Sequence, residues 1–261
     1  MGERRPGYRS LPPSPFLPSF LLTRPLPRTV PPFVDEDDVP RRIPRLGDMT
    51  LADIPPEVGL FPLSGVLLLP RGKLPLNVFE PRYIALVEDA LATHRLIGLI
   101  QPRWQEDEDE ENEAPPLYTI GCLGRLTSMT ERADGTYAMT LTGLLRFRLL
   151  RETGLRRGYR VARIDVSSYA GDLNEIPSEP FDRAQLLNSL KSYFQKKGLN
   201  ARWSLIEQMD DSLLLVTLPM ICPFPPAEKQ ALLDAENLTD RVRVLQTLLD
   251  LSGPEQEGPP S

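Results

Sequence analysis

The chain has few of the residues with which enzymes do most of their chemistry. Its 261 residues include one histidine, His94, and two cysteines, Cys122 and Cys222, which form no CxxC pair. A single histidine excludes His-rich zinc sites and leaves one candidate histidine base, and no GxSxG element accompanies it. His94 ends a predicted helix, a position typical of a partner for the helix dipole. We therefore predict that the chain is not an enzyme and has no catalytic, cofactor-binding or metal-binding residues.

Long apolar runs and a positive net charge are also lacking. No stretch approaches the roughly 18 apolar residues of a membrane helix, which excludes an integral membrane protein. The formal charge is -6 and the pI is about 5.1, so the overall charge does not attract phosphate backbones. Two distant cysteines and the lack of a convincing export signal are typical of a reducing compartment. We predict a cytoplasmic protein whose default partner is neither membrane nor nucleic acid.

Glycine and carboxylate patterns add no phosphate-binding or acid–base site. Gly72-Lys73 resembles the end of a P-loop, but Gly65 lies too far upstream and Leu74 stands where a Ser or Thr would bind Mg²⁺. The acidic run from Glu106 to Glu111 predicts a solvated loop, because six like charges repel one another. These patterns leave a binding role as the main possibility.

Proline is concentrated at the N-terminal end. Residues 1–48 hold 11 of the 29 prolines, and such a segment cannot propagate a helix or a sheet ladder. We predict a disordered head over residues 1–58. A start of the native protein at Met49, with an upstream extension of the reading frame before it, is an equally open interpretation.

Residues 59–173 have the pattern of a β-rich unit. Apolar runs separated by Pro and Gly predict strands at GLFPL, VLLLP, LPLNVF, RLIGLIQ and GYRVARIDVSSY. Ala133-Asp134-Gly135 predicts a hairpin turn, and Gly143 predicts a bend or bulge in the second strand of that hairpin. Pro81 opens an amphipathic pattern that predicts one helix packed on the strands.

Residues 174–252 change to the helical period of about 3.6. A longer helix is predicted up to Lys196, Lys197 and Gly198, and four shorter ones after it, with Pro219 among the prolines that separate two of them. Residues 253–261 are predicted to be a disordered tail. The predicted fold class is therefore α+β, with a β-rich subdomain followed by a helical bundle.

The turn between LPLNVF and the first helix is the strongest candidate for a binding surface. An apolar, proline-stiffened turn leaves side chains that can line a groove. The alternative is that the apolar side chains are core and the charged ones bridge locally. The candidate residues are Leu76, Phe79, Glu80, Arg82 and Tyr83.

A local cluster of arginines supports a second hypothesis, RNA binding, despite the acidic total. The alternative is that these side chains form the solvated face of two strands. The cluster consists of Arg146, Arg148, Arg151, Arg156, Arg157, Arg160 and Arg163.

Two long blocks resemble the N-terminal substrate-binding domain of Lon proteases, in its free-standing bacterial form. They are FPLSGVLLLPRGKLPLNVFEPRYIALVEDAL and IGCLGRLTSMTERADGTYAMTLTGLLRFRLL, and the likeness continues to CPFPPAEKQALLDAENLTDRVRVLQTLL. The resemblance covers about residues 59–251. It implies a PUA-like pseudo-barrel with one packed helix, followed by a helical bundle. No Walker motif is present, so the ATPase and peptidase activities of Lon are not implied.

The resemblance implies a module that holds unfolded or tagged polypeptides, as an adaptor for a protease or as a holdase. Strand addition and side-chain pockets are both open modes of binding. An RNA-binding PUA-like module is the alternative, and an undetected hydrolase is a third hypothesis.

Overall fold

The computed structural model describes residues 43–103, 115–174 and 181–251. The predicted proline-rich segment up to residue 42, the acidic run and the tail from residue 253 lie outside these ranges. Within them, no helix is long and apolar enough to cross a membrane.

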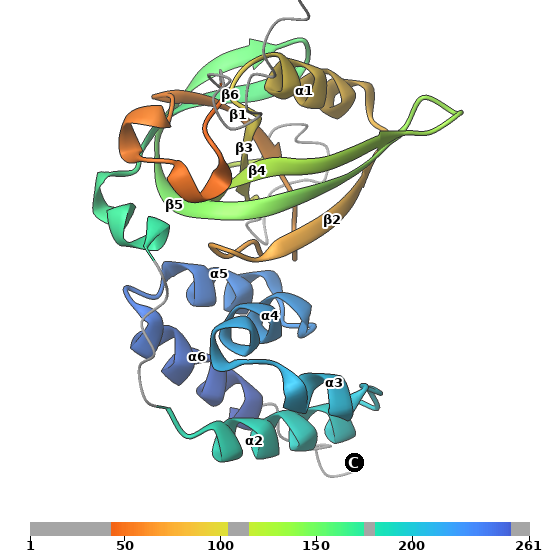
Figure 1. The fold of residues 1–261 in the computed structure, drawn as a ribbon, viewed down its shortest axis with the longest axis vertical. Coiled ribbons are helices and arrows are strands. Elements are labelled where there is room, and N and C mark those ends of the chain that lie inside the picture. Colours follow the sequence, from red (N-terminus) through yellow and green to blue (C-terminus); the bar gives the residue numbers. More distant parts are fainter. Residues whose placement is uncertain (1–42, 104–114, 175–180, 252–261) are drawn as a thin grey trace, which may run out of the picture. The chain divides into compact units, whose positions relative to one another are not determined.

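Six strands form one sheet that closes on itself (Figure 1). The strand order is β2-β5-β4-β3-β1-β6, and β5 also pairs with β6. The long β5 makes this closure possible, because its first half pairs with β4 and its last part with β6. The strands are β1 (Glu57–Pro62), β2 (Lys73–Val78), β3 (Leu96–Ile100), β4 (Ile120–Glu131), β5 (Tyr137–Arg156) and β6 (Tyr159–Asp165). The pseudo-barrel is therefore confirmed, with β2 added outside the ring.

The predicted bulge at Gly143 is present. Gly124 pairs with Gly143 but Leu123 pairs with Leu145, which leaves Leu144 as the extra residue. A Cβ at Gly143 would lie 2.0 Å from the carbonyl oxygen of Leu69, so only glycine fits this close approach.

One of the predicted strands, in the segment that passes close to Gly143, is absent. VLLLP, residues 66–70, is not a strand, although Leu67, Leu68 and Leu69 are all buried. An apolar run of this length predicts burial, and burial here is achieved by an irregular segment that fills the core.

One helix, α1 (Pro81–Ala92), covers an end of the barrel (Figure 1). Pro81 occupies its first position as predicted, where the missing N–H costs no hydrogen bond. Its apolar face is buried in the core through residues that include Leu86 and Val87. His94 lies in the exposed turn that follows.

Five helices form the C-terminal part, as the period predicts. They are α2 (Arg183–Lys196), α3 (Trp203–Gln208), α4 (Asp211–Ile221), α5 (Pro226–Asp234) and α6 (Leu238–Leu251). Asp182 and Asp210 cap α2 and α4 by accepting backbone hydrogen bonds. Pro219 does not separate two helices as predicted but lies inside α4, where it is buried.

A buried cation joins the barrel to the helices. Arg146 of β5, expected on a solvated face, is only 5% exposed. Its guanidinium pairs with Asp172 at 2.9 Å and donates to the carbonyl oxygens of Leu233, Ala235 and Glu236 at the end of α5. The prediction of an exposed Arg146 is wrong because the end of a helix, with its free carbonyls, lies over this position.

Further contacts join the two parts. Gln101 donates to the carbonyl oxygen of Pro226 and to the side chain of Gln230, and Lys229 donates to the carbonyl oxygen of Gly65. One apolar cluster includes residues of both parts, so the α+β class is confirmed as a single packed unit over the described residues.

Residues 43–58, expected to be disordered, carry two short 3-10 helices, η1 (Leu46–Asp48) and η2 (Leu51–Asp53). Met49 is 7% exposed and packs in the second apolar cluster, beside barrel residues such as Phe147. The folded part therefore begins before the predicted boundary at residue 59.

Candidate functional site

The predicted surface at the β2–α1 turn is only partly a surface. Phe79 is 68% exposed, and Leu76 of β2 is half-buried against the core. Glu80 and Arg82 form an ion pair at 2.7 Å, which is the local bridge that the alternative interpretation describes.

Tyr83 belongs to the core. Its ring is 8% exposed and lies 4.3 Å, centroid to centroid, from the ring of Phe61. The guanidinium of Arg82 lies over the same ring, 4.8 Å from its centroid. Burial raises the pKa of Tyr83, so its hydroxyl stays protonated. Tyr83 is therefore a core residue and not part of the lining of a groove.

The outer edge of β2 offers a poor template for strand addition. β2 pairs with β5 and with no other strand of the described residues. Pro75 stands in the middle of this edge strand and has no N–H to donate. The side-chain oxygen of the exposed Asn77 already accepts a hydrogen bond from Arg132 at 2.8 Å. These features protect an edge against pairing with another chain.

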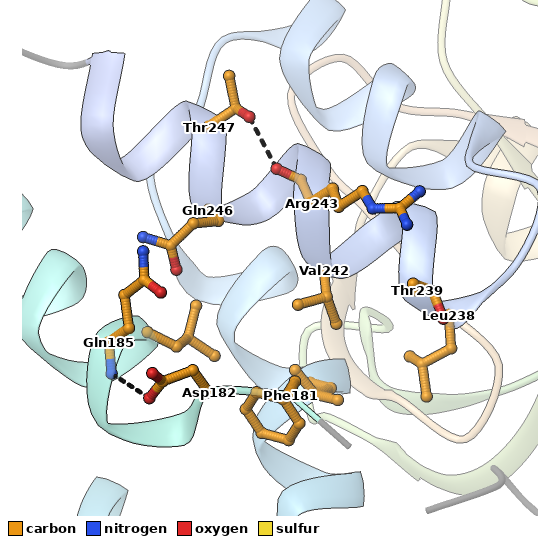
Figure 2. A pocket seen from close by; sticks show the side chains of 11 residues that line it. Phe181, Asp182, Gln185, Leu238, Thr239, Val242, Arg243, Gln246 and Thr247 are labelled. Atoms are coloured by element: carbon orange, nitrogen blue, oxygen red, sulfur yellow. Dashed lines mark hydrogen bonds between the residues drawn. The ribbon is translucent and has the colours of Figure 1, made fainter. Parts of the chain in front are cut away.

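The helical part contains a cavity of about 510 Å³ between α2, α4 and α6, which we call the α2–α6 cavity (Figure 2). Its apolar lining comes from Phe181, Leu186, Leu215, Leu238 and Val242, and its polar lining from Asp182, Gln185, Thr239, Arg243, Gln246 and Thr247. In Figure 2 the side chains of Gln185, from α2, and Gln246, from α6, approach each other. A cavity of this size and polarity suits an apolar group held by a few amides.

The charged groups at the α2–α6 cavity are already engaged. Asp182 accepts the backbone N–H of Gln185 at 2.9 Å, and Arg243 pairs with Asp240 at 2.8 Å. The amide of Gln246 donates to Ser189 at 2.6 Å. None of these contacts joins a nucleophile to a base, so the arrangement can bind but has no evident catalytic step.

Sequence reasoning missed the α2–α6 cavity because it is built from three helices. Leu238, Val242 and Gln246 recur at intervals of four residues, which places them on one face of α6. That row predicts a face of the helix, but it cannot say whether the face is filled by a neighbour.

The arginine cluster is largely neutralised. Arg156 pairs with Glu57 at 3.3 Å, Arg157 pairs with Glu88 and Asp89, and Arg160 pairs with Glu152. With Arg146 buried, only Arg148, Arg151 and Arg163 of the cluster have no ion pair with another described residue. These three side chains are exposed, as the interpretation of a solvated strand face predicts.

The nucleophilic side chains are buried. Cys122 is 1% exposed and Cys222 is not exposed at all. Burial raises the pKa of both thiols, that of Cys222 to about 12, which holds them in the unreactive protonated form. Over the described ranges, no three His, Cys, Asp or Glu side chains gather as a metal site would require.

Comparison with known families identifies the fold. The family model for the ATP-dependent protease La (LON) substrate-binding domain matches residues 57–250 of the chain. Lon protease 2 of Myxococcus xanthus is 28% identical over 201 residues, which cover 76% of this chain and 24% of that protein. A Lon protease of Anaeromyxobacter dehalogenans is 34% identical over 114 residues, covering 44% and 13%. The chain thus matches at most about a quarter of the length of these relatives.

Two solved structures share the architecture. A Lon N-terminal domain protein from Xanthomonas campestris aligns with a TM-score of 0.51 and 20% identity, over 73% of this chain and 97% of that one. The N-terminal domain of a Mycobacterium avium complex Lon protease aligns with a TM-score of 0.50 and 18% identity, over 74% and 97%. At this identity the likeness shows the fold alone.

Proposed function

Because the chain belongs to the LON substrate-binding domain family, we propose that it is a non-catalytic module that binds polypeptides. The α2–α6 cavity carries the proposal. An apolar cavity with amide groups in its lining can hold an apolar side chain and hydrogen-bond to the peptide backbone beside it. Folded proteins bury such side chains, so the module would select unfolded or tagged chains.

We propose the β2–α1 surface as a second contact. Phe79 and Leu76 are its apolar residues, and the Glu80–Arg82 ion pair forms its polar edge. Tyr83 supports the surface from below rather than touching the client. Because Pro75 weakens strand addition, side-chain pockets are the favoured mode.

The role of such a module is an adaptor that delivers clients to a Lon-type protease, or a holdase that keeps them soluble, in the cytoplasm. Polypeptide is favoured over RNA as the ligand because four of the seven clustered arginines are paired with carboxylates. An arginine whose charge is offset by a carboxylate contributes less to the release of counterions from a phosphate backbone.

The cavity is tested by filling it. Fluorescence anisotropy would measure the affinity of the full chain for labelled apolar peptides. Gln185→Trp places an indole at the opening, whereas Asn188→Trp changes an exposed residue of the same helix that does not line the cavity. We expect Gln185→Trp to weaken binding about tenfold or more, the scale of one buried apolar side chain. Unchanged affinity in Gln185→Trp would exclude the cavity, and no binding of any peptide would refute the proposed function.

The β2–α1 surface has a matched control in the same assay. Phe79→Ser removes a side chain that is 68% exposed, and Leu155→Ser removes one that is 73% exposed at the end of β5. We expect a loss of affinity only in Phe79→Ser. Equal losses of affinity in the two variants would show that any exposed apolar side chain contributes to peptide binding, and would exclude a specific role of the β2–α1 surface.

A further inference from the structure

A second apolar hollow lies at the other end of the helical part. It has a volume of about 450 Å³, and Leu199, Leu205, Ile221 and Pro223 are among its lining residues. We call it the α3–α4 hollow. Leu205 and Ile221 are 52% and 53% exposed, so the hollow opens to solvent through large apolar side chains. Such side chains are commonly exposed one at a time, and several in one concave site mark an interaction surface.

Positively charged side chains lie at and beside the hollow. Arg202 lines it, and Lys196 and Lys197 end α2 just before Leu199, which also lines it. These three exposed cations have no ion pair within the described parts of the chain.

The neighbouring cations of the helical part are neutralised instead. Lys191 pairs with Glu207 at 2.8 Å, Arg183 pairs with Asp211, and Arg243 pairs with Asp240. Of the carboxylates next to the hollow in sequence, Glu207 and Asp211 are therefore paired with cations, and Asp210 accepts hydrogen bonds at the start of α4. The positive charge beside it is free to act on an incoming ligand.

We propose that the α3–α4 hollow binds polypeptide segments in which an apolar residue is flanked by Asp or Glu. This inference rests on the proposed polypeptide-binding function and names the sequence class that this second site selects. Burial of the apolar side chain drives the association, and the carboxylates meet Arg202, Lys196 and Lys197 at the rim. Rim charges act mainly on selectivity and association rate, so the preference weakens as salt rises.

Two labelled peptides with one apolar core, flanked by Asp in one and by Lys in the other, test the charge preference on the full chain. We expect the acidic peptide to bind about tenfold more tightly at low salt, with the difference shrinking at 0.5 M NaCl, since each exposed pair contributes a factor of about two to five. The triple variant Lys196→Gln, Lys197→Gln and Arg202→Gln should remove the preference. Arg151→Gln, an exposed arginine on β5 without an ion pair among described residues, should keep it.

The apolar part is tested by Leu205→Ser against Leu213→Ser. Leu213 is 49% exposed in α4 and does not line the hollow. We expect binding of the acidic peptide to be lost only in Leu205→Ser. Circular dichroism of both variants checks that the helices remain folded.

Specific outcomes would overturn the inference. Equal affinity for the two peptides, or a preference that survives in the triple variant, would remove the charge-selective site while leaving peptide binding at the α2–α6 cavity intact. A concentration-dependent dimer that Leu205→Ser abolishes would assign the hollow to a second copy of the chain. Displacement of the acidic peptide by an equal concentration of single-stranded RNA would assign it to nucleic acid. Failure of every peptide to bind would refute both proposals together.

Discussion

The barrel and the helical part differ in how completely they bury their apolar side chains. In the barrel, Leu60, Leu123, Leu141, Leu145 and Phe147 have no exposed surface. Its exposed large apolar side chains are those of Leu51 in η2, Phe79 in the turn before α1, and Leu150 and Leu155 in the last third of β5. In the helical part, by contrast, the exposed side chains of Leu199, Leu205 and Ile221 line one hollow, and a larger cavity lies between three helices.

The difference follows from the geometry of the two parts. A closed sheet satisfies its own backbone and encloses its core, which leaves little apolar area outside. Helices of 6 to 14 residues are too short to interdigitate over a long contact and leave spaces between them. The barrel therefore acts as the rigid part, and the helices provide most of the concave apolar surface.

Breaking the junction should have the largest effect. Arg146→Ala leaves the largely buried carboxylate of Asp172 without its partner and the carbonyl oxygens at the end of α5 without a donor. We expect a loss of about 3–5 kcal/mol in the free energy of unfolding, measured by urea denaturation. The neighbouring Arg148→Ala, which removes an exposed side chain, should cost less than about 0.5 kcal/mol. A cost below about 1 kcal/mol for Arg146→Ala would show that the two parts hold together without this contact.

The two cysteines allow the parts to be compared directly, because Cys122 lies in β4 and Cys222 follows α4. Both thiols are buried, so each reacts only when its own region opens. We expect Cys222 to be alkylated about tenfold faster than Cys122, a difference of about 1.4 kcal/mol in opening free energy. Single-cysteine variants and peptide mass mapping measure the rates. Equal rates would mean that barrel and helices open only together.

A smaller effect is expected within the barrel, at the contact of α1 with β6. Asp89 accepts hydrogen bonds from Tyr159 and Arg157, each at 2.7 Å, and these lower its pKa below 3.8. A carboxyl with a lowered folded-state pKa stabilises the fold above its unfolded pKa of about 3.9, and this contribution is lost as the pH falls through the folded value.

The variant Asp89→Asn should therefore lose stability at pH 7, on the scale of about 0.2–1 kcal/mol for an exposed pair. Its difference from the parent chain should shrink below pH 4. Urea denaturation over this pH range measures it, and a difference that is constant with pH would exclude the ionic contribution.

Local patterns predicted the elements well. Pro81 opens α1, Gly143 marks the bulge, and Lys196 ends α2, because each reflects a steric or electrostatic preference that acts within a few residues. Leu67 to Leu69 were predicted to be a strand because an apolar run gives burial but not backbone conformation. Of the candidate surface, Phe79 is exposed and Tyr83 is core, and no local pattern separates the two.

The sequence by itself determined the α+β class, the family, and the scarcity of catalytic side chains. These depend on periodicity, motif spacing and residue counts. Only the tertiary structure decided that Arg146 is buried under α5, that other clustered arginines are paired, and that two concave apolar sites lie among the helices. Each of these depends on which distant segments meet, and that is set by packing of the whole core rather than by neighbours in the chain.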